Sequence, residues 1–143
     1  MIHERPSLPK VAVGAVIFRD QEVLLIKRGR APFKGHWSIP GGKITFGETI
    51  HAALHREVLE ETGVKIDILG LIDVFESVPQ SEAEAHHYVM MDYACRYAGG
   101  EVQAGDDAEM AEFVSLPEAM ARLAWDETRR AVQGALPFLS KMR

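Results

Sequence analysis

The N-terminal part of the chain alternates short apolar runs with polar segments that contain glycine and proline. Residues 11–18 are apolar, rich in valine and too few for a stable helix, so we expect a strand buried on both faces. A polar turn at residues 19–22 separates this run from a second one at residues 23–27, which predicts an antiparallel hairpin. A basic loop at residues 28–37 and a brief extended segment ended by Pro40 follow.

Residues 49–62 predict a helix because they lack glycine and proline and are dominated by Ala, Leu and Glu. Thr49 is a suitable N-cap, and Gly63 lies where a helix stop is expected. Apolar residues recur at helical spacing and indicate one buried face: Ile50, Ala53, Leu54 and Val58.

The rest of the pattern predicts three more strands, two polar loops and one or two final helices. The strands are expected at residues 64–78, 87–97 and 112–116, and the loops at residues 79–85 and 98–108. Pro117 is placed for a helix start, with residues 119–125 and 128–136 helical. A mixed sheet with a helix between its strands and helices after it is an α/β arrangement in layers. At 143 residues the chain is expected to form one domain, residues 1–143.

Composition and charge exclude some classes of function but do not identify one. The chain is 47% hydrophobic and 26% charged, which is typical of a globular protein. Its net charge of −5 argues against a nucleic-acid partner, since such surfaces need clustered Lys and Arg. Small anionic substrates remain compatible, because bound divalent cations can invert the local field.

The chain is expected to be cytoplasmic, with no membrane partner. The single cysteine, Cys95, excludes an internal disulfide and fits a reducing compartment. Residues 11–18 differ from a signal-peptide core, because Glu4 and two prolines precede them and Arg19 and Asp20 follow. No apolar run approaches the roughly 20 residues that a spanning helix needs. The oligomeric state stays open, a homodimer included.

Three carboxylates gather on the predicted helix of residues 49–62. Glu57, Glu60 and Glu61 share one helical face within two turns, where like charges repel. Taken alone, such a set is typical of a solvated acidic face. The surrounding spacing favours another interpretation.

Around these acids, residues 42–64 hold a set of positions at fixed spacing. They are Gly42, Glu48, Arg56, Glu57, Val58, Glu60, Glu61, Gly63 and Val64. This pattern resembles the Nudix box, the signature of the Nudix hydrolase superfamily, and the preceding segment WSIPGG, residues 37–42, is similar to that family's lead-in. The resemblance implies an α/β/α sandwich with a mixed sheet. It also implies hydrolysis of a nucleoside diphosphate linked to another group, with Mg²⁺ or Mn²⁺.

By this resemblance, Glu57, Glu60 and Glu61 are the metal ligands, with the carbonyl of Gly41 as a further contact. Mg²⁺ prefers oxygen ligands, which carboxylates on one helical face can supply together with water and substrate phosphate. A metal pair could polarise the pyrophosphate and lower the pKa of a bound water.

The resemblance gives Arg56 and Glu48 a positioning role. Arginine keeps its charge, and its planar fork holds carboxylates in fixed geometry. Arg56 and Glu48 are therefore expected to tie the loop to the helix and to aim the ligands. Gly47 and Gly63 are expected to be conformational.

The group that accepts a proton from the attacking water is less defined by the sequence. Aligning residues 112–116 with the similar strand of MutT-type members places Asp107 at a late-loop carboxylate. Asp106, Glu109 and Glu60 are the alternatives.

Several residues are candidates to contact the substrate. Arg28, Arg30 and Lys34 of the basic loop could hold phosphate oxygens. His87 is expected to line the substrate pocket. Three aromatic residues could stack on a nucleobase: Phe33, Trp37 and Phe75. For Trp37 and Phe75, packing in the core is the better default.

The sequence favours hydrolysis of ADP-ribose or a similar nucleotide sugar. Pro79 lies fifteen residues past Val64, close to a proline found in ADP-ribose-cleaving members. Glu82 and Glu84 are expected to repel a third phosphate. The main alternative is MutT-like cleavage of oxidised nucleoside triphosphates. A nucleotide-sugar sensor and an isopentenyl diphosphate isomerase are disfavoured, because the box is intact and Cys95 lies within a predicted strand.

Overall fold

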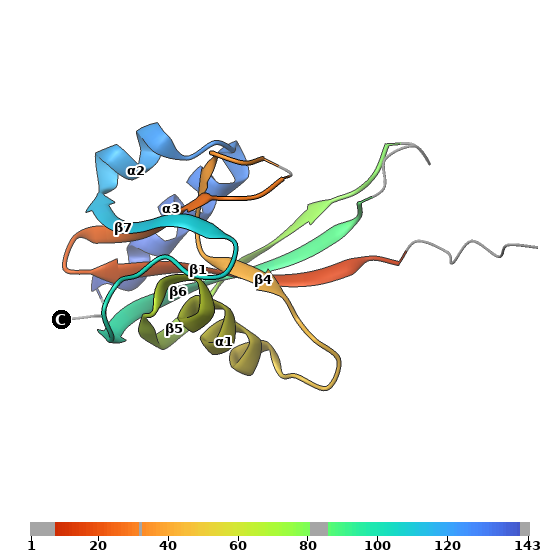
Figure 1. The fold of residues 1–143 in the computed structure, drawn as a ribbon, viewed down its shortest axis with the longest axis horizontal. Coiled ribbons are helices and arrows are strands. Elements are labelled where there is room, and N and C mark those ends of the chain that lie inside the picture. The colour runs from red at the N-terminus through yellow and green to blue at the C-terminus, as the bar shows by residue number, and fades with distance from the viewer. Residues whose placement is uncertain (1–7, 32, 81–85, 141–143) are drawn as a thin grey trace, which may run out of the picture.

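The computed structural model describes residues 8–31, 33–80 and 86–140. Within them, a seven-stranded mixed sheet carries helices on both faces (Figure 1). The elements in chain order are β1 (Lys10–Arg19), β2 (Glu22–Arg28), β3 (Trp37–Ser38), β4 (Gly41–Lys43), α1 (Ile50–Thr62), β5 (Lys65–Ser77), β6 (Tyr88–Gly99), β7 (Ala108–Ser115), α2 (Leu116–Arg122) and α3 (Asp126–Leu139).

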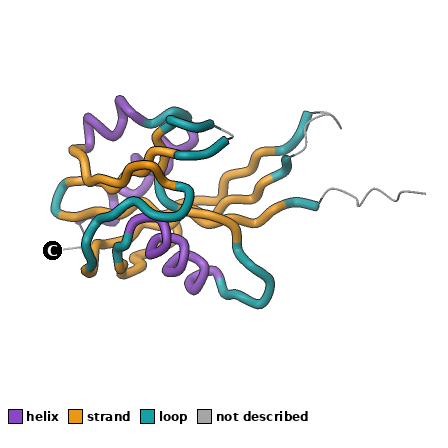
Figure 2. The backbone as a smooth tube through the Cα atoms, viewed as in Figure 1, coloured by secondary structure: helices purple, strands orange, loops and turns teal. Residues whose placement is uncertain are grey.

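The strands are ordered β3-β2-β1-β6-β5, with β4 also paired to β1 and β7 to β2. The predicted β1–β2 hairpin is confirmed, and β1 runs parallel to β6. Gly41 of β4 pairs with Gly14 of β1, which brings the segment before α1 to the middle of the sheet. β5 and β6 continue beyond the part of the sheet that the helices cover (Figure 2).

The side chains of β1 are buried on both faces, as predicted. Val13 and Ile17 pack toward α1, whereas Val16 and Phe18 pack toward α2 and α3. All four are fully buried. A strand covered on both sides has no solvent face, so its sequence is an unbroken apolar run.

The predicted limits of α1 are confirmed. The Thr49 hydroxyl accepts a hydrogen bond from the Ala52 amide at 3.1 Å, which satisfies a free donor of the first turn. Gly63 ends the helix with φ of 73°, a left-handed conformation that costs glycine little.

The C-terminal elements differ in extent from the prediction. β7 begins at Ala108, four residues earlier than expected, because it pairs with β2 as far as Arg28. α2 begins at Leu116, since the Ser115 hydroxyl caps it by accepting from the Glu118 amide, and it ends at Arg122. Among the described residues, no helix has both the length and the apolar character to cross a membrane.

Candidate active site

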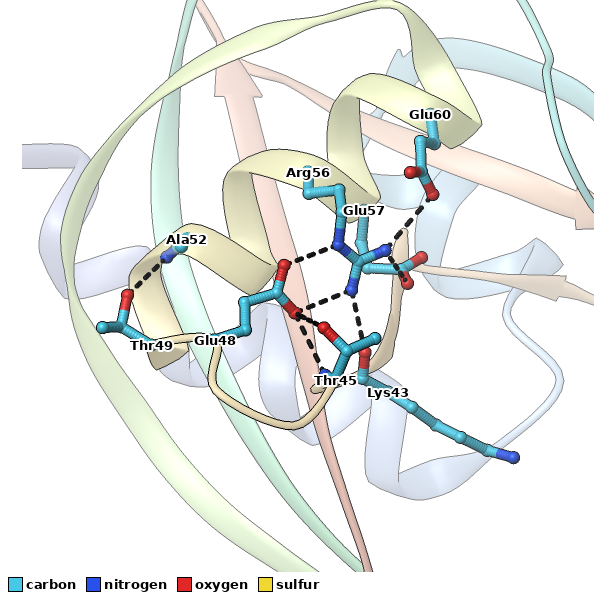
Figure 3. Close-up of polar contacts among 8 residues, drawn as sticks. All are labelled: Lys43, Thr45, Glu48, Thr49, Ala52, Arg56, Glu57 and Glu60. Carbon is cyan, nitrogen blue, oxygen red and sulfur yellow. Dashed lines mark hydrogen bonds and ion pairs between the residues drawn. The ribbon is translucent and has the colours of Figure 1, made fainter.

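The guanidinium of Arg56 is the centre of the polar contacts on α1 (Figure 3). Its Nε donates to one oxygen of Glu48 at 2.6 Å, and Nη2 donates to the other at 2.9 Å. On its other side, Nη1 donates to Glu57 at 2.8 Å and to Glu60 at 3.3 Å. Nη2 also donates to the Lys43 carbonyl at 3.1 Å. One arginine therefore joins the loop before α1 to the acidic face of that helix.

Glu48 is held from both sides. Besides Arg56, the amide and hydroxyl of Thr45 donate to Glu48 at 3.1 and 3.0 Å. The hydrogen bond from Arg56, aided by those from Thr45, lowers the pKa of Glu48 to about 2. The turn between Thr45 and Glu48 passes through Gly47, which has φ of 86°. This geometry supports the positioning role expected of Glu48 and Arg56.

Three carboxylates from two segments meet beside Arg56. Glu57 and Glu60 of α1 and Asp106 of the loop before β7 each bring one oxygen within 4.8 Å of the others. Burial raises the pKa of Glu57, against the opposing effect of Arg56. Carboxylate oxygens are the ligands that hard divalent cations take, so this donor set fits Mg²⁺ or Mn²⁺.

The loop that carries Asp106 is fixed by backbone contacts to the end of α1. The Gln103 amide donates to the Thr62 carbonyl at 2.9 Å, and the Gly105 amide donates to the Glu61 carbonyl at 3.0 Å. A Cβ on Gly105 would clash with the Glu60 carbonyl, so only glycine allows this approach. Asp106 itself has φ of 50°, an uncommon conformation for a residue with a side chain.

Glu61 is not one of the three clustered carboxylates, although the charges of Glu57 and Asp106 act on it. Its side chain is only 6% exposed and accepts a hydrogen bond from the Gly41 amide at 2.8 Å. Burial raises the pKa of Glu61 to about 8, although the Gly41 hydrogen bond opposes this. The contact with Gly41 is through its amide. A Cβ on the adjacent Gly42 would clash with the Glu57 carboxylate, and a Cβ on Gly41 would clash with the backbone of β1 at Val13, so each glycine permits a close approach.

Asp107, the residue favoured by the sequence, and its neighbour Asp106 have different side-chain partners in the structure. Asp107 forms an ion pair with Arg30 at 3.2 Å, and its carbonyl accepts from the Gly29 amide at 2.8 Å. The acid that joins Glu57 is Asp106, because Asp106 is next to the glycine that touches α1.

A cleft of about 330 Å³ lies beside Asp106, and two of the predicted phosphate-binding residues line it. Arg30 and Lys34 are on one side, with residues 106–109 opposite. Arg28 ends β2, and its charge acts on Glu61. The cleft therefore brings the basic loop and the late acidic loop together, which their sequence separation did not reveal.

The other predicted substrate contacts have different surroundings. Trp37 in β3 is half-buried beneath the guanidinium of Arg122, 4.8 Å from its ring centre. The His87 carbonyl accepts from the Lys10 amide at the start of β1. Phe75 packs against the core beside α3. Glu82 and Glu84 lie outside the described residues.

Sequence reasoning missed the structural role of Gly105 and the buried acid Asp92. The segment GDD, residues 105–107, carried a signal, since a glycine beside two acids allows close backbone approach to a site. Asp92 interrupts the apolar segment YVMMDYAC, residues 88–95, and a charged residue in a buried strand is rare. Both signals were present in the sequence.

Comparisons with known proteins agree with this geometry. A family model described as NUDIX domain matches residues 8–134. The ADP-ribose pyrophosphatase of Methanocaldococcus jannaschii is 40% identical over 121 residues, which are 85% of this chain and 70% of that protein. The crystal structure of a MutT NUDIX hydrolase from Burkholderia pseudomallei has a TM-score of 0.73 and 31% identity, covering 89% of this chain and 98% of that chain.

A NUDIX hydrolase from Nitrosomonas europaea gives a TM-score of 0.77 at 26% identity, covering 93% of this chain and 72% of that one. The fold expected from the box, an α/β sandwich with a mixed sheet, is thereby confirmed. The chain belongs to the Nudix family of pyrophosphohydrolases.

Proposed function

We propose that the chain hydrolyses the pyrophosphate bond of ADP-ribose or a similar nucleotide sugar, with Mg²⁺ or Mn²⁺ as cofactor. The cluster of Glu57, Glu60 and Asp106 beside the cleft of Arg30 and Lys34 is the observation that carries the proposal. The 40% identity to a protein named ADP-ribose pyrophosphatase supports the substrate.

In this proposal, Glu57, Glu60 and Asp106 hold the metal, and Glu61 and the Gly41 carbonyl remain further candidate ligands. A bound divalent cation would neutralise pyrophosphate oxygens and lower the pKa of a coordinated water. Arg56 neutralises part of the negative charge of the cluster and fixes the direction of the Glu57 carboxylate. The protein thereby presents oxygen ligands in a preset arrangement.

The residues around the cleft have separate tasks. Arg30 and Lys34 attract the phosphates, with Arg28 at the end of the same strand-loop segment. Because Asp107 is engaged by Arg30, Asp106 and Glu60 are better placed than Asp107 to accept a proton from the attacking water. Glu109 lines the same cleft as a further candidate.

We also propose a cytoplasmic protein that acts on a small nucleotide and binds no nucleic acid. The net charge of −5 supports the absence of a nucleic-acid partner. The buried thiol Cys95 supports a reducing compartment. The whole chain is proposed to act as one domain, with residues 42–64 as its Nudix box.

The experiment compares substrates at one Mg²⁺ concentration. ADP-ribose is expected to yield AMP and ribose 5-phosphate, with kcat/KM above the values for dGTP and 8-oxo-dGTP. A clear preference for either triphosphate would support the MutT-like alternative, which the Burkholderia structure's name favours.

A further inference from the structure

The loop between β6 and β7 completes the C-terminal end of α1. The last carbonyl groups of an α-helix have no amide of the same helix within reach, so they need donors from elsewhere. Two amides of this loop supply them. The Gln103 amide donates to the Thr62 carbonyl at 2.9 Å, and the Gly105 amide donates to the Glu61 carbonyl at 3.0 Å. The loop is therefore bonded to the helix that carries two of the clustered carboxylates.

Gly105 approaches α1 more closely than a residue with a side chain could. A Cβ on Gly105 would clash with the Glu60 carbonyl oxygen, which is backbone and cannot swing aside. The φ of Gly105 is not positive, so its conformation alone would admit alanine. The requirement for glycine therefore comes from the contact with Glu60.

The same loop also touches the end of α1 where it leaves β6. A Cβ on Gly100 would clash with the Gly63 carbonyl, and a Cβ on Gly63 would clash with the Glu101 carbonyl. The Tyr97 hydroxyl donates to the Gly100 carbonyl at 2.5 Å and fixes the start of the loop. Residues 100–105 are thus held against the helix at both ends of the segment.

Asp106 lies between two backbone anchors, one on each side of it in the chain. Before it, Gly105 is bonded to α1. After it, the Asp107 carbonyl accepts a hydrogen bond from the Gly29 amide at 2.8 Å, just past the end of β2. The second contact is also close, since a Cβ on Gly29 would lie 3.2 Å from the Asp107 carbonyl oxygen. Two separate elements of the fold therefore fix the backbone around Asp106.

The backbone of Asp106 is in the left-handed region, with φ of 50°. A residue with a side chain keeps such a conformation where its surroundings impose it, and such residues cluster at functional sites. In this conformation one oxygen of Asp106 lies within 4.8 Å of oxygens of Glu57 and Glu60. The two anchors thus hold a strained residue whose carboxylate joins the cluster.

We propose that Gly105 is a positioning residue for the divalent-cation site, because its contact with α1 sets the Asp106 carboxylate beside Glu57 and Glu60 before substrate binds. The inference rests on the proposed function, since it concerns how one ligand of the proposed metal is placed. Glu57 and Glu60 are directed by the helix itself. Asp106 comes from a loop, so its direction depends on the backbone that flanks it.

Gly29 supports the same placement from the basic loop. It precedes Arg30, which lines the cleft together with Lys34, and its amide holds the residue after Asp106. A Cβ on Gly29 would require a shift of only a few tenths of an ångström, which is a milder disturbance than the clash at Gly105. Through these two glycines, the metal ligand and the phosphate-binding loop keep a fixed spacing.

The test measures Mn²⁺ binding to the nucleotide-free protein by electron paramagnetic resonance. Gly105→Ala is expected to weaken Mn²⁺ binding about fivefold or more, as Asp106→Asn does, because the added Cβ forces the loop away from α1. Gly29→Ala is expected to cause a smaller loss. The matched control is Gly134→Ala in α3, whose Cβ would lie 2.7 Å from the Ile72 side chain and which should bind Mn²⁺ as wild type does.

A double-substitution cycle separates positioning from a general structural role. If Gly105 acts through Asp106, Gly105→Ala should cause no further loss of Mn²⁺ affinity in the Asp106→Asn background. Equal losses in the two backgrounds would overturn the inference, and so would wild-type affinity in Gly105→Ala. If Gly105→Ala does not fold, Gly29→Ala replaces it in the same cycle, and its loss must likewise disappear when Asp106 is Asn.

The outcome for the inference can be told apart from the outcome for the proposed function. If Mn²⁺ binding depends on Gly105 through Asp106 but ADP-ribose is not cleaved, the inference stands and the proposed substrate is wrong. If wild type binds no Mn²⁺, the inference falls together with the proposed metal site. An equal loss of Mn²⁺ affinity in Gly134→Ala would also contradict it, because that change lies in α3 and leaves the loop untouched.

Discussion

The acids beside α1 and the acid beneath α3 lie on the same sheet but meet opposite surroundings. Glu48 and Glu57 share the guanidinium of Arg56; the pKa of Glu48 is lowered to about 2, whereas burial raises the pKa of Glu57 against the effect of Arg56. Burial raises the pKa of Asp92 to about 7, aided by the two charged groups that act on it, Glu127 and Asp73, which are both acidic. Beside α1, ion pairs with Arg56 hold the carboxylates of Glu48 and Glu57 in place. Beneath α3, the Asp92 carboxylate has one oxygen, Oδ1, with no hydrogen-bond donor among the described residues. Glu48 and Glu57 are thus oriented by internal pairing, whereas Asp92 Oδ1 is buried without such a partner in the part of the chain that the structure describes.

Glu57→Gln tests the first region most strongly. The substitution removes a ligand charge at constant shape, and we expect kcat to fall by at least about 10²-fold, roughly 2.7 kcal/mol of barrier. Steady-state assays with ADP-ribose and Mg²⁺ measure it. The matched control is Glu118→Gln, an exposed acid of α2 paired with Arg122, which should keep its turnover. Near-wild-type turnover by Glu57→Gln would remove this residue from the metal site.

Arg56→Lys separates charge from geometry in the same region. Lysine keeps the charge but cannot hold both oxygens of Glu48, so we expect kcat to fall by about tenfold while Mn²⁺ still binds. Arg96→Lys is the control, since Arg96 pairs with the exposed Asp67. The combined variant Glu48→Gln with Arg56→Lys should cost less than the sum of the single changes. Strict additivity would show that the two residues act independently.

Asp106→Asn and Asp107→Asn form a matched pair one residue apart. Asp106 faces Glu57 and Glu60, whereas Asp107 pairs with Arg30. We expect Asp106→Asn to weaken Mg²⁺ activation several-fold and Asp107→Asn to change it less. Activity measured across a Mg²⁺ titration decides between them. A larger effect at Asp107 would restore the assignment that the sequence favoured.

Asp92→Asn should leave turnover nearly unchanged and alter the pH dependence of stability. The pKa of Asp92 rises from 3.8 to about 7 on folding, so its contribution to stability is complete below 3.8 and is lost as the pH rises through about 7. The facing charged groups are Glu127 and Asp73; Gly14 contributes none. The variant lacks this loss, so its stability relative to wild type should rise between about pH 4 and pH 7 and stay level above that in urea unfolding. Parallel pH curves for the two proteins would contradict the burial of a titrating Asp92.

The sequence predicted the elements whose signals are local. β1 is an apolar run, and α1 has a helical stripe between Thr49 and Gly63, so both were placed within one or two residues. The start of β7 was missed because residues 108–111 are strand only through pairing with β2. That pairing is a long-range contact, and no local pattern records it.

The candidate site shows the same division. The spacing of the box predicted that Glu48, Arg56 and Glu57 belong to one site, and in the structure hydrogen bonds from Arg56 join them. The choice between Asp106 and Asp107 depended on which side chain a tight loop turns toward α1. Adjacent residues in such a loop can point in different directions, so only the fold distinguishes them.

Mn²⁺ binding to the nucleotide-free protein, followed by electron paramagnetic resonance, tests the central claim most directly. The claim is that Glu57, Glu60 and Asp106 form a divalent-cation site without help from substrate. Wild type is expected to bind Mn²⁺, with affinity reduced by about tenfold or more in Glu60→Gln and unchanged in Glu118→Gln. Equal Mn²⁺ affinity in wild type and Glu60→Gln would contradict the account.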